Sequence, residues 1–267
     1  MLRDITLGQF FPGASPLHRM DPRVKILWTL FYIILLFLVN DYVGFLLYAI
    51  FNLAIIKISG IRPRLVFSGL KPLLYLLIFT ALLNIFVSGG ETVLFRIWIL
   101  RATREGVYMA GMMALRLIFL VIGTSMLTFT TSPIVLTDGI EHLLRPFKKI
   151  GVPAHEIAMM MTIAIRFIPT ILEETDKIMK AQTARGADFE SGNILRRAKA
   201  MIPLLIPLFI SAFRRADELA MAMECRCYHG GEGRSRMHVL KVSRVDIASI
   251  PIAVLLLLGI LFTRIYL

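Results

Sequence analysis

The chain has 267 residues, 57% of them hydrophobic, and a mean hydropathy of +0.74, which together exclude an ordinary soluble globular domain. Its formal net charge of +12 is typical of a membrane protein that keeps Lys and Arg on the cytoplasmic side of an anionic bilayer. Nucleic-acid binding explains the charge less well, and we expect no nucleic-acid partner. The two cysteines, Cys225 and Cys227, are too few and too close for a disulfide framework, which favours a reducing, cytoplasmic location for them.

Five apolar segments approach the bilayer length of about 20 residues and predict transmembrane helices. They cover residues 26–39, 42–58, 66–87, 106–130 and 247–267. The residues before the first segment lack the apolar core and small-residue cleavage site of a signal peptide, so we expect none to be removed. Between the third and fourth segments, the alternating pattern of "LFRIWILRAT" predicts a short extended hairpin.

Basic residues that flank these segments indicate how the chain is oriented in the membrane. Four precede the first segment, and four lie where the second segment ends and the third begins: Arg3, Arg19, Arg23, Lys25, Lys57, Arg62, Arg64 and Lys71. Arg96, Arg101 and Arg104 on the opposite side weaken this asymmetry, but the basic region downstream is much larger. We therefore predict a multi-pass membrane protein with a cytoplasmic N-terminus and, after five spans, a C-terminus outside.

The region between the fourth and fifth segments carries many charges of both signs. Its apolar stretches, "IAMMMTIAI" and "MIPLLIPLFISAF", are too short for secure spans, and each runs into a charged amphipathic helix. We place these long helices at the cytoplasmic membrane face. We expect a bend at Pro169 in the first, and a helix pair bent at Pro203 and Pro207 in the second.

These patterns predict an all-α integral membrane protein with about five transmembrane helices and long amphipathic coupling helices. The predicted organisation has three parts. They are an N-terminal four-helix membrane region (1–131), a cytoplasmic-face coupling region with two Arg motifs (132–245), and a C-terminal transmembrane helix (246–267).

The two long helices end alike. When Arg185 is placed over Arg226, 41 positions later, Asp176 coincides with Asp217 and Ala181 with Ala222. Two matches in a short window are compatible with chance or with an approximate internal duplication. An arginine at a helix C-terminus is favourable beside the negative end of the helix dipole, so ordinary capping is one interpretation. The other is that each arginine is a plug, because a guanidinium offers a planar fork of donors to a partner groove.

Three stretches, "LRDITLGQFFPGASPLHRMDPRVK", "RFIPTILEETDKIMKAQTARGADF" and "FRRADELAMAMECRCYHGGEGR", carry a resemblance that spans nearly the whole chain. The chain resembles the transmembrane coupling (T) component of energy-coupling factor transporters. The resemblance implies a prokaryotic plasma-membrane importer of vitamins or trace nutrients. It also implies two ABC-type ATPase partners and a substrate-binding membrane (S) subunit.

In that family, Ala-Arg-Gly motifs end two coupling helices that dock in grooves on the ATPases. The first motif matches as Ala184-Arg185-Gly186, whereas the second, Cys225-Arg226-Cys227, departs at both flanking positions. The resemblance therefore assigns ATPase docking to six residues: Ala184, Arg185, Gly186, Cys225, Arg226 and Cys227. Because position 227 is not glycine, we expect the second helix to continue to Gly230-Gly231.

The sequence offers little support for nucleotide binding or for a metal site. The chain has no G-x-x-x-x-G-K-[ST] loop, so we expect a non-catalytic subunit that binds no nucleotide and needs no cofactor. A soft-metal site at Cys225, Cys227 and His229 lacks a fourth ligand, and we predict no metal. The acidic residues Glu173, Glu174 and Asp176 fit a solvated helix face or part of the ATPase contact.

Two rival functions remain. A self-sufficient secondary transporter would use Arg116 and Asn84, which lie inside the predicted spans, although cross-helix pairing explains them better. An intramembrane enzyme would need a catalytic constellation, but the five histidines are scattered and form no hydrolase motif. Transport by the chain alone, or activity without partners, would support these rivals.

Overall fold

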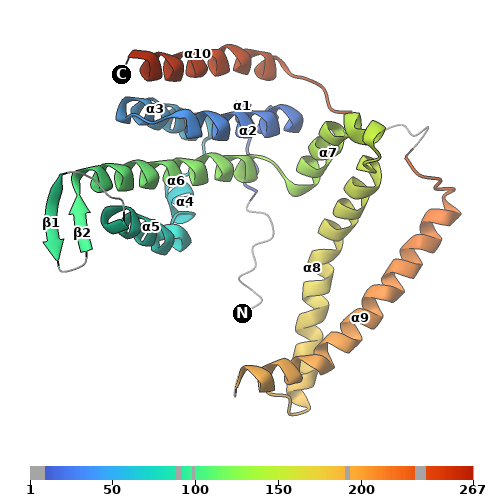
Figure 1. The fold of residues 1–267 in the computed structure, drawn as a ribbon. Helices are drawn as coiled ribbons and strands as arrows, with labels where there is room; N and C mark the ends of the chain where they lie inside the picture. The colour runs from blue at the N-terminus through green and yellow to red at the C-terminus, as the bar shows by residue number, and fades with distance from the viewer. Residues whose placement is uncertain (1–9, 88–91, 98–99, 190–192, 232–238, 267) are drawn as a thin grey trace. The chain divides into compact units, whose positions relative to one another are not determined.

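A computed structural model describes residues 10–87, 92–97, 100–189, 193–231 and 239–266 (Figure 1). The chain divides into two compact units. The first, which we call the core unit, comprises residues 8–140 and 239–267. The second, the two-helix unit, comprises residues 141–238 together with 1–7.

The core unit is helical apart from one short hairpin. Its elements are α1 (Pro16–Arg19), α2 (Pro22–Leu38), α3 (Tyr42–Ser59), α4 (Pro63–Ser68), η2 (Lys71–Leu73), α5 (Leu74–Val87), β1 (Val93–Ile97), β2 (Leu100–Thr103), α6 (Arg104–Thr130), α7 (Pro133–Leu144) and α10 (Arg244–Tyr266). The last residues of α7 already belong to the two-helix unit.

Helix α6 lies at the centre of the core unit, between α5 on one side and the α2–α3 pair on the other (Figure 1). Helix α10 packs against α2 and α3. The side chains between these layers are fully buried, among them Leu36, Tyr48, Phe45 and Ile260. The Tyr48 hydroxyl donates to the backbone oxygen of Tyr32 at 3.0 Å, so its polar end is satisfied inside the apolar core.

Local signals set the helix boundaries. Helix α2 begins with Pro22, and the Asp21 side chain before it accepts from the Arg23 backbone N–H at 2.9 Å. Helix α3 ends at Gly60, which takes the left-handed conformation with φ 70°. The Thr103 hydroxyl caps α6 by accepting from the Gly106 N–H at 3.1 Å.

The predicted hairpin is confirmed, because β1 and β2 pair antiparallel and meet at Ile97 and Leu100. They form the one pair of strands among the residues that the structure describes. The fold class is therefore the predicted all-α membrane class, with this hairpin as a small addition.

Within the described part of the chain, five helices are long and apolar enough to cross a membrane. They cover Tyr42–Ser59, Pro63–Phe86, Arg104–Thr130, Ala154–Ala184 and Arg244–Ile265. The number agrees with the prediction, and the chain is a multi-pass membrane protein, but the membership differs in two places. Helix α2, which holds the predicted first span, is not in this set because its 17 residues reach only about 25 Å along the helix axis. Helix α8 enters it instead, because Arg166 is the only charged residue between Ile157 and Leu172.

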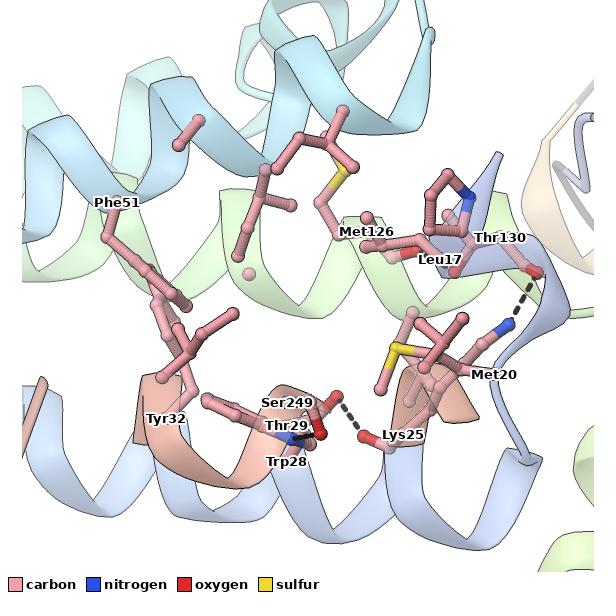
Figure 2. Close-up of a pocket in the computed structure, with 18 of the residues that line it drawn as sticks. Leu17, Met20, Lys25, Trp28, Thr29, Tyr32, Phe51, Met126, Thr130 and Ser249 are labelled. Carbon is pink, nitrogen blue, oxygen red and sulfur yellow. Dashed lines mark hydrogen bonds between the residues drawn. The ribbon is translucent and has the colours of Figure 1, made fainter. Parts of the chain in front are cut away.

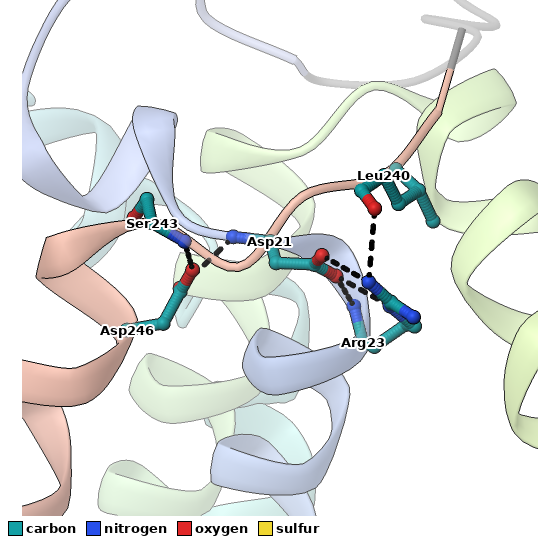
Figure 3. Close-up of polar contacts among 5 residues, drawn as sticks. All are labelled: Asp21, Arg23, Leu240, Ser243 and Asp246. Carbon is teal, nitrogen blue, oxygen red and sulfur yellow. Dashed lines mark hydrogen bonds and ion pairs between the residues drawn. The ribbon is translucent and has the colours of Figure 1, made fainter.

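A polar clasp joins the start of α2 to the start of α10 (Figure 3). The Asp246 carboxylate is 2% exposed and accepts from the Asp21 N–H at 3.0 Å and the Ser243 N–H at 2.6 Å. The Asp21 carboxylate pairs with the Arg23 guanidinium at 2.8 Å, which also donates to the Leu240 backbone oxygen at 3.3 Å. The clasp fixes the final helix against the second one.

The two-helix unit consists of η3 (Arg145–Ile150), α8 (Ala154–Ala184) and α9 (Ile194–Cys225). The chain descends α8 and returns along α9, which packs against it (Figure 1). Pro203 and Pro207 lie inside one continuous helix of 32 residues, so the expected helix pair is wrong. An interior proline removes one hydrogen bond and distorts a helix, but the remaining bonds and the packing against α8 keep it intact.

Candidate docking tips

The first candidate tip is the C-terminus of α8. The helix ends at Ala184, Arg185 occupies the C-cap with φ −88°, and Gly186 turns into the left-handed region with φ 88°. The Gly186 N–H donates to the Thr183 oxygen at 3.0 Å and the Ala187 N–H to the Gln182 oxygen at 3.0 Å. This pair of bonds is the Schellman motif, which satisfies the last carbonyl groups of a helix.

The second candidate tip, the C-terminus of α9, repeats this geometry 41 positions later. The helix ends at Cys225, and Arg226 is the C-cap with φ −92°. The Cys227 N–H donates to the Glu224 oxygen at 2.8 Å and the Tyr228 N–H to the Met223 oxygen at 3.1 Å. Each backbone bond of the first tip therefore has a counterpart, and both arginines occupy the same position in the same motif.

The expected continuation of the second helix to Gly230-Gly231 is wrong. Cys227 takes the left-handed conformation with φ 55° and is the only non-glycine residue with positive φ among those the structure describes. That conformation costs a non-glycine residue about 1–2 kcal/mol. The two Schellman bonds and the packing of Tyr228 hold the turn in place, so the helix stops without glycine.

All six predicted docking residues are exposed: Ala184, Arg185, Gly186, Cys225, Arg226 and Cys227. Within the described residues, neither arginine side chain forms a hydrogen bond or ion pair with another part of the chain. A Cβ atom at position 186 would have no atom within 4 Å, so glycine is favoured there by its backbone conformation and not by crowding inside the chain. Both guanidinium groups are thus available to a partner.

Side chains from α7 and α8 support the second tip. The Tyr228 hydroxyl lies 3.4 Å from His155 Nε2, and His155 Nδ1 lies 3.2 Å from the Glu141 carboxylate, which is largely buried. Gly231 packs so closely that a Cβ atom there would lie 2.4 Å from the His155 ring. A cavity of about 460 Å³ adjoins this tip, lined in part by Met159 and Arg226. Sequence reasoning missed His155 because nothing in its neighbourhood marks it as a partner of a residue 73 positions away.

An ion pair fastens α8 to α9. Arg215 Nη2 lies 2.9 Å from Glu174 Oε2, and both side chains are partly buried. These residues are also 41 positions apart, the same offset that superposes the two tips. Helices α8 and α9 run in opposite directions (Figure 1), so a rotation close to two-fold through this contact would superpose one helix on the other. The shared backbone bonds and the ion pair are compatible with the internal duplication, which stays a prediction.

The structure does not bring Arg116 and Asn84 into one site. Arg116 on α6 donates to the Val39 backbone oxygen at 2.6 Å and so caps the end of α2, with its guanidinium 5.6 Å from the Phe37 ring. Asn84 on α5 donates to the Thr80 oxygen of its own helix.

The two side chains also lie at different levels of α6. A Cβ atom at Gly106 would lie 2.9 Å from the backbone oxygen of Asn84. Arg116 is ten residues further along the helix, a rise of about 15 Å. Both residues therefore have structural roles in the described contacts.

Comparison with known proteins decides the family. Residues 13–239 match the family described as cobalt transport protein. Over 263 residues the chain is 59% identical to the energy-coupling factor transporter transmembrane protein of Clostridium kluyveri, covering 98% of this chain and 97% of that one. The chain belongs to the transmembrane (T) components of energy-coupling factor transporters.

Two further relatives of the same name extend this T-component family. The protein of Thermosediminibacter oceani is 55% identical over 98% of this chain and 99% of its own. That of Bacillus subtilis is 42% identical over 98% of both chains. The resemblance stated from the sequence is confirmed, and the chain is a membrane component of a transporter.

Proposed function

We propose that this T component is the scaffold of an importer of vitamins or other micronutrients in a prokaryotic plasma membrane. It docks two cytoplasmic ATPases, which hydrolyse ATP, and passes their motion to a substrate-binding membrane (S) subunit. The observation that carries the proposal is the pair of identically built helix tips, each with an exposed arginine at the C-cap. The chain itself is non-catalytic in this proposal.

The backbone of each tip suits docking. The Schellman bonds already occupy the carbonyl groups two and three positions before each C-cap, so a partner does not have to satisfy those groups. The guanidinium is then free to meet carboxylates or backbone oxygens in a groove with two parallel hydrogen bonds. Two similar tips, related by a local rotation, fit two similar grooves on a symmetric ATPase pair. The residues beside the two arginines are small enough to let the walls of those grooves approach the backbone of each tip: Ala184, Gly186, Cys225 and Cys227.

The α8–α9 pair supports transmission of motion. Helix α8 has 31 residues, so a displacement of its tip is carried over about 46 Å as long as the helix remains stiff. The Glu174–Arg215 pair lies between the tips and makes the two helices pivot together. Closing the ATPases would thus change the angle at which the helices cross.

An apolar stripe on α9 is the surface that we assign to the S subunit. Ile202, Ile206, Phe209 and Phe213 recur at helical spacing and are 50–68% exposed. Phenylalanine and isoleucine exposed in one row lose contact with water when a membrane subunit covers them. The rotation of α9 would then move that subunit and release its substrate inward.

Reversing the charge of each tip tests the docking. We expect that the double variant Arg185→Glu, Arg226→Glu remains in the membrane but loses both ATPases on copurification and loses nutrient uptake. A carboxylate in a groove built for a cation costs about 2–5 kcal/mol. Each single variant should weaken assembly less. Arg214→Glu is the matched control, because this exposed arginine lies on α9 away from the tip.

The same experiment can contradict the proposed docking of the two tips. If the double variant keeps both ATPases and full uptake, the arginines are only helix caps and docking lies elsewhere on residues 132–245. Uptake by the purified chain alone in liposomes would instead favour the self-sufficient transporter. That reading has no supporting contact between Arg116 and Asn84 in the described structure.

A further inference from the structure

The core unit contains a cavity of about 580 Å³ that docking and transmission do not use (Figure 2). Five helices line it: α1, α2, α3, α6 and α10. Its volume falls in the range of about 300–1,000 Å³ that is typical of small-molecule sites. All the residues that line the cavity belong to the core unit.

The polar groups at the cavity wall are already paired with one another. Lys25 Nζ donates to the Thr130 backbone oxygen at 2.9 Å and to the Thr131 hydroxyl at 3.0 Å. The Trp28 indole N–H donates to the Ser249 hydroxyl at 2.8 Å (Figure 2). Because these groups have partners, a ligand gains little by offering polar atoms. The rest of the wall is mainly apolar, which selects a hydrocarbon ligand.

The cavity opens sideways between α3 and α10. These helices touch where a Cβ atom at Gly259 would lie 3.1 Å from the Leu47 side chain. Further toward the end of α3, the lining residues Ala54, Ile58 and Ala248 are exposed, so the wall is incomplete there.

The surface beside this opening is apolar. Leu53 on α3 is 63% exposed and Ile247 on α10 is 61% exposed. In a protein that crosses the membrane several times, such a surface faces lipid chains. The opening is therefore continuous with the hydrocarbon of the bilayer.

Three cationic residues lie next to lining residues of the cavity, at one end of the core unit. Arg19, Lys57 and Arg244 are exposed, and each is the direct sequence neighbour of a residue that lines the cavity. Within the described residues, none of their side chains forms a hydrogen bond or ion pair with another part of the chain. They lie at the end of the unit where α1 and α10 begin and α3 ends. An anionic group is the complement of such a rim.

We propose that the cavity holds one acyl chain of an anionic phospholipid that enters from the bilayer between α3 and α10. The phosphate of its head group lies at the rim formed by Arg19, Lys57 and Arg244. The acyl chain fills the space between Trp28 and Met126, and so completes the packing of five helices. This inference does not depend on the docking of ATPases.

Photo-crosslinking of the full chain in phosphatidylcholine nanodiscs tests the proposal. The probe is a small proportion of phosphatidylglycerol with a diazirine in its acyl chain. We expect labelled peptides that contain cavity residues such as Leu17 and Met126. Phosphatidylcholine with the same diazirine chain should give far less of this label. Labelling confined to outward residues such as Leu53 and Ile247, or equal labelling by both probes, would overturn the proposal.

Two sets of variants sharpen the result. Ala248→Trp places an indole in the opening and should abolish the cavity label, whereas Ile247→Trp on the neighbouring lipid-facing position should keep it. Ala54→Trp tests the opposite wall if Ala248→Trp does not fold. The triple change Arg19→Gln, Lys57→Gln, Arg244→Gln should remove the preference for phosphatidylglycerol. Arg264→Gln at the far end of α10 is the control, and an unchanged preference in the triple variant would contradict the rim.

Discussion

Cys227 occupies the position at the second tip that Gly186 occupies at the first. Both residues turn the chain into the left-handed region, with φ 55° and 88°. Only glycine does so without a steric penalty. Strain that persists at an exposed turn is a reason to look for function there, because the surrounding contacts must hold it. At Cys227 these contacts are the Schellman bonds and the link from Tyr228 to His155.

Replacing Cys227 by glycine should raise the stability of the folded chain, whereas the same replacement at Cys225 should lower it. Cys227→Gly relieves about 1–2 kcal/mol of strain, and part of this is offset by about 0.5–1 kcal/mol of additional backbone entropy in the unfolded chain. We expect a slightly raised thermal unfolding midpoint for the purified chain. Cys225→Gly is the matched control, because position 225 is helical and glycine there costs about 1 kcal/mol. If the unfolding midpoints of the two variants shift in the same direction, the left-handed conformation of Cys227 is not strained.

Helices α8 and α9 are coupled at the element scale by the Glu174–Arg215 ion pair. The side chains are about one third and one quarter exposed, so solvent screens the attraction and the pair contributes about 0.5–1 kcal/mol. The location of this ion pair between the two helices matters more than its small contribution to stability. It lies where a residue contacts its counterpart in the predicted repeat, and in the proposed function this contact is the pivot about which the two helices move together.

Exchanging the charges of Glu174 and Arg215 tests whether the attraction between the two side chains is needed for uptake. Glu174→Arg or Arg215→Glu alone places two like charges together and should slow nutrient uptake by the assembled transporter. The double exchange restores an opposite pair and should recover much of the rate. Uptake rates and copurified ATPase are measured together, so that loss of coupling is distinguished from loss of assembly. If the exchanged pair is no better than the single variants, the ion pair is not the pivot.

At the scale of the whole molecule, the placement of α8 decides the topology. Its apolar first half satisfies the length and composition of a span, whereas its charged second half favours the membrane surface. We propose that α2 crosses the membrane as the first span and that α8 stays on the cytoplasmic side, which leaves the N-terminus inside and the C-terminus outside. Both arginine tips then face the same compartment as the ATPases.

Labelling of single cysteines from outside the cell tests this topology directly. In a chain whose native cysteines are replaced by serine, we place Lys149→Cys before α8, Lys180→Cys near its end and Arg264→Cys near the end of α10. A membrane-impermeant maleimide should label position 264 in intact cells, but positions 149 and 180 only after lysis. Labelling of either 149 or 180 from outside would show that α8 crosses the membrane. The Cys-free chain without additions is the background control.

Several features could be predicted because they depend on short-range physics. Apolar length revealed most of the spans, and alternation revealed the β1–β2 hairpin. The helix stop at the first tip followed from Gly186. The stop at the second tip did not, because the backbone bonds of Cys227 and the packing of Tyr228 outweigh the missing glycine. Proline likewise suggested a helix pair where packing keeps α9 whole.

By itself, the sequence determined the membrane class, the family and the identity of the two arginine tips, because hydropathy and motif are properties of contiguous residues. Only the tertiary structure decided what joins distant residues. It placed Asp246 in a clasp with Asp21, Arg116 at the end of α2, and Glu174 against its own counterpart Arg215. It also formed the cavity among five helices. Such contacts arise from the packing of separate helices, and no local pattern in the sequence records which faces will meet.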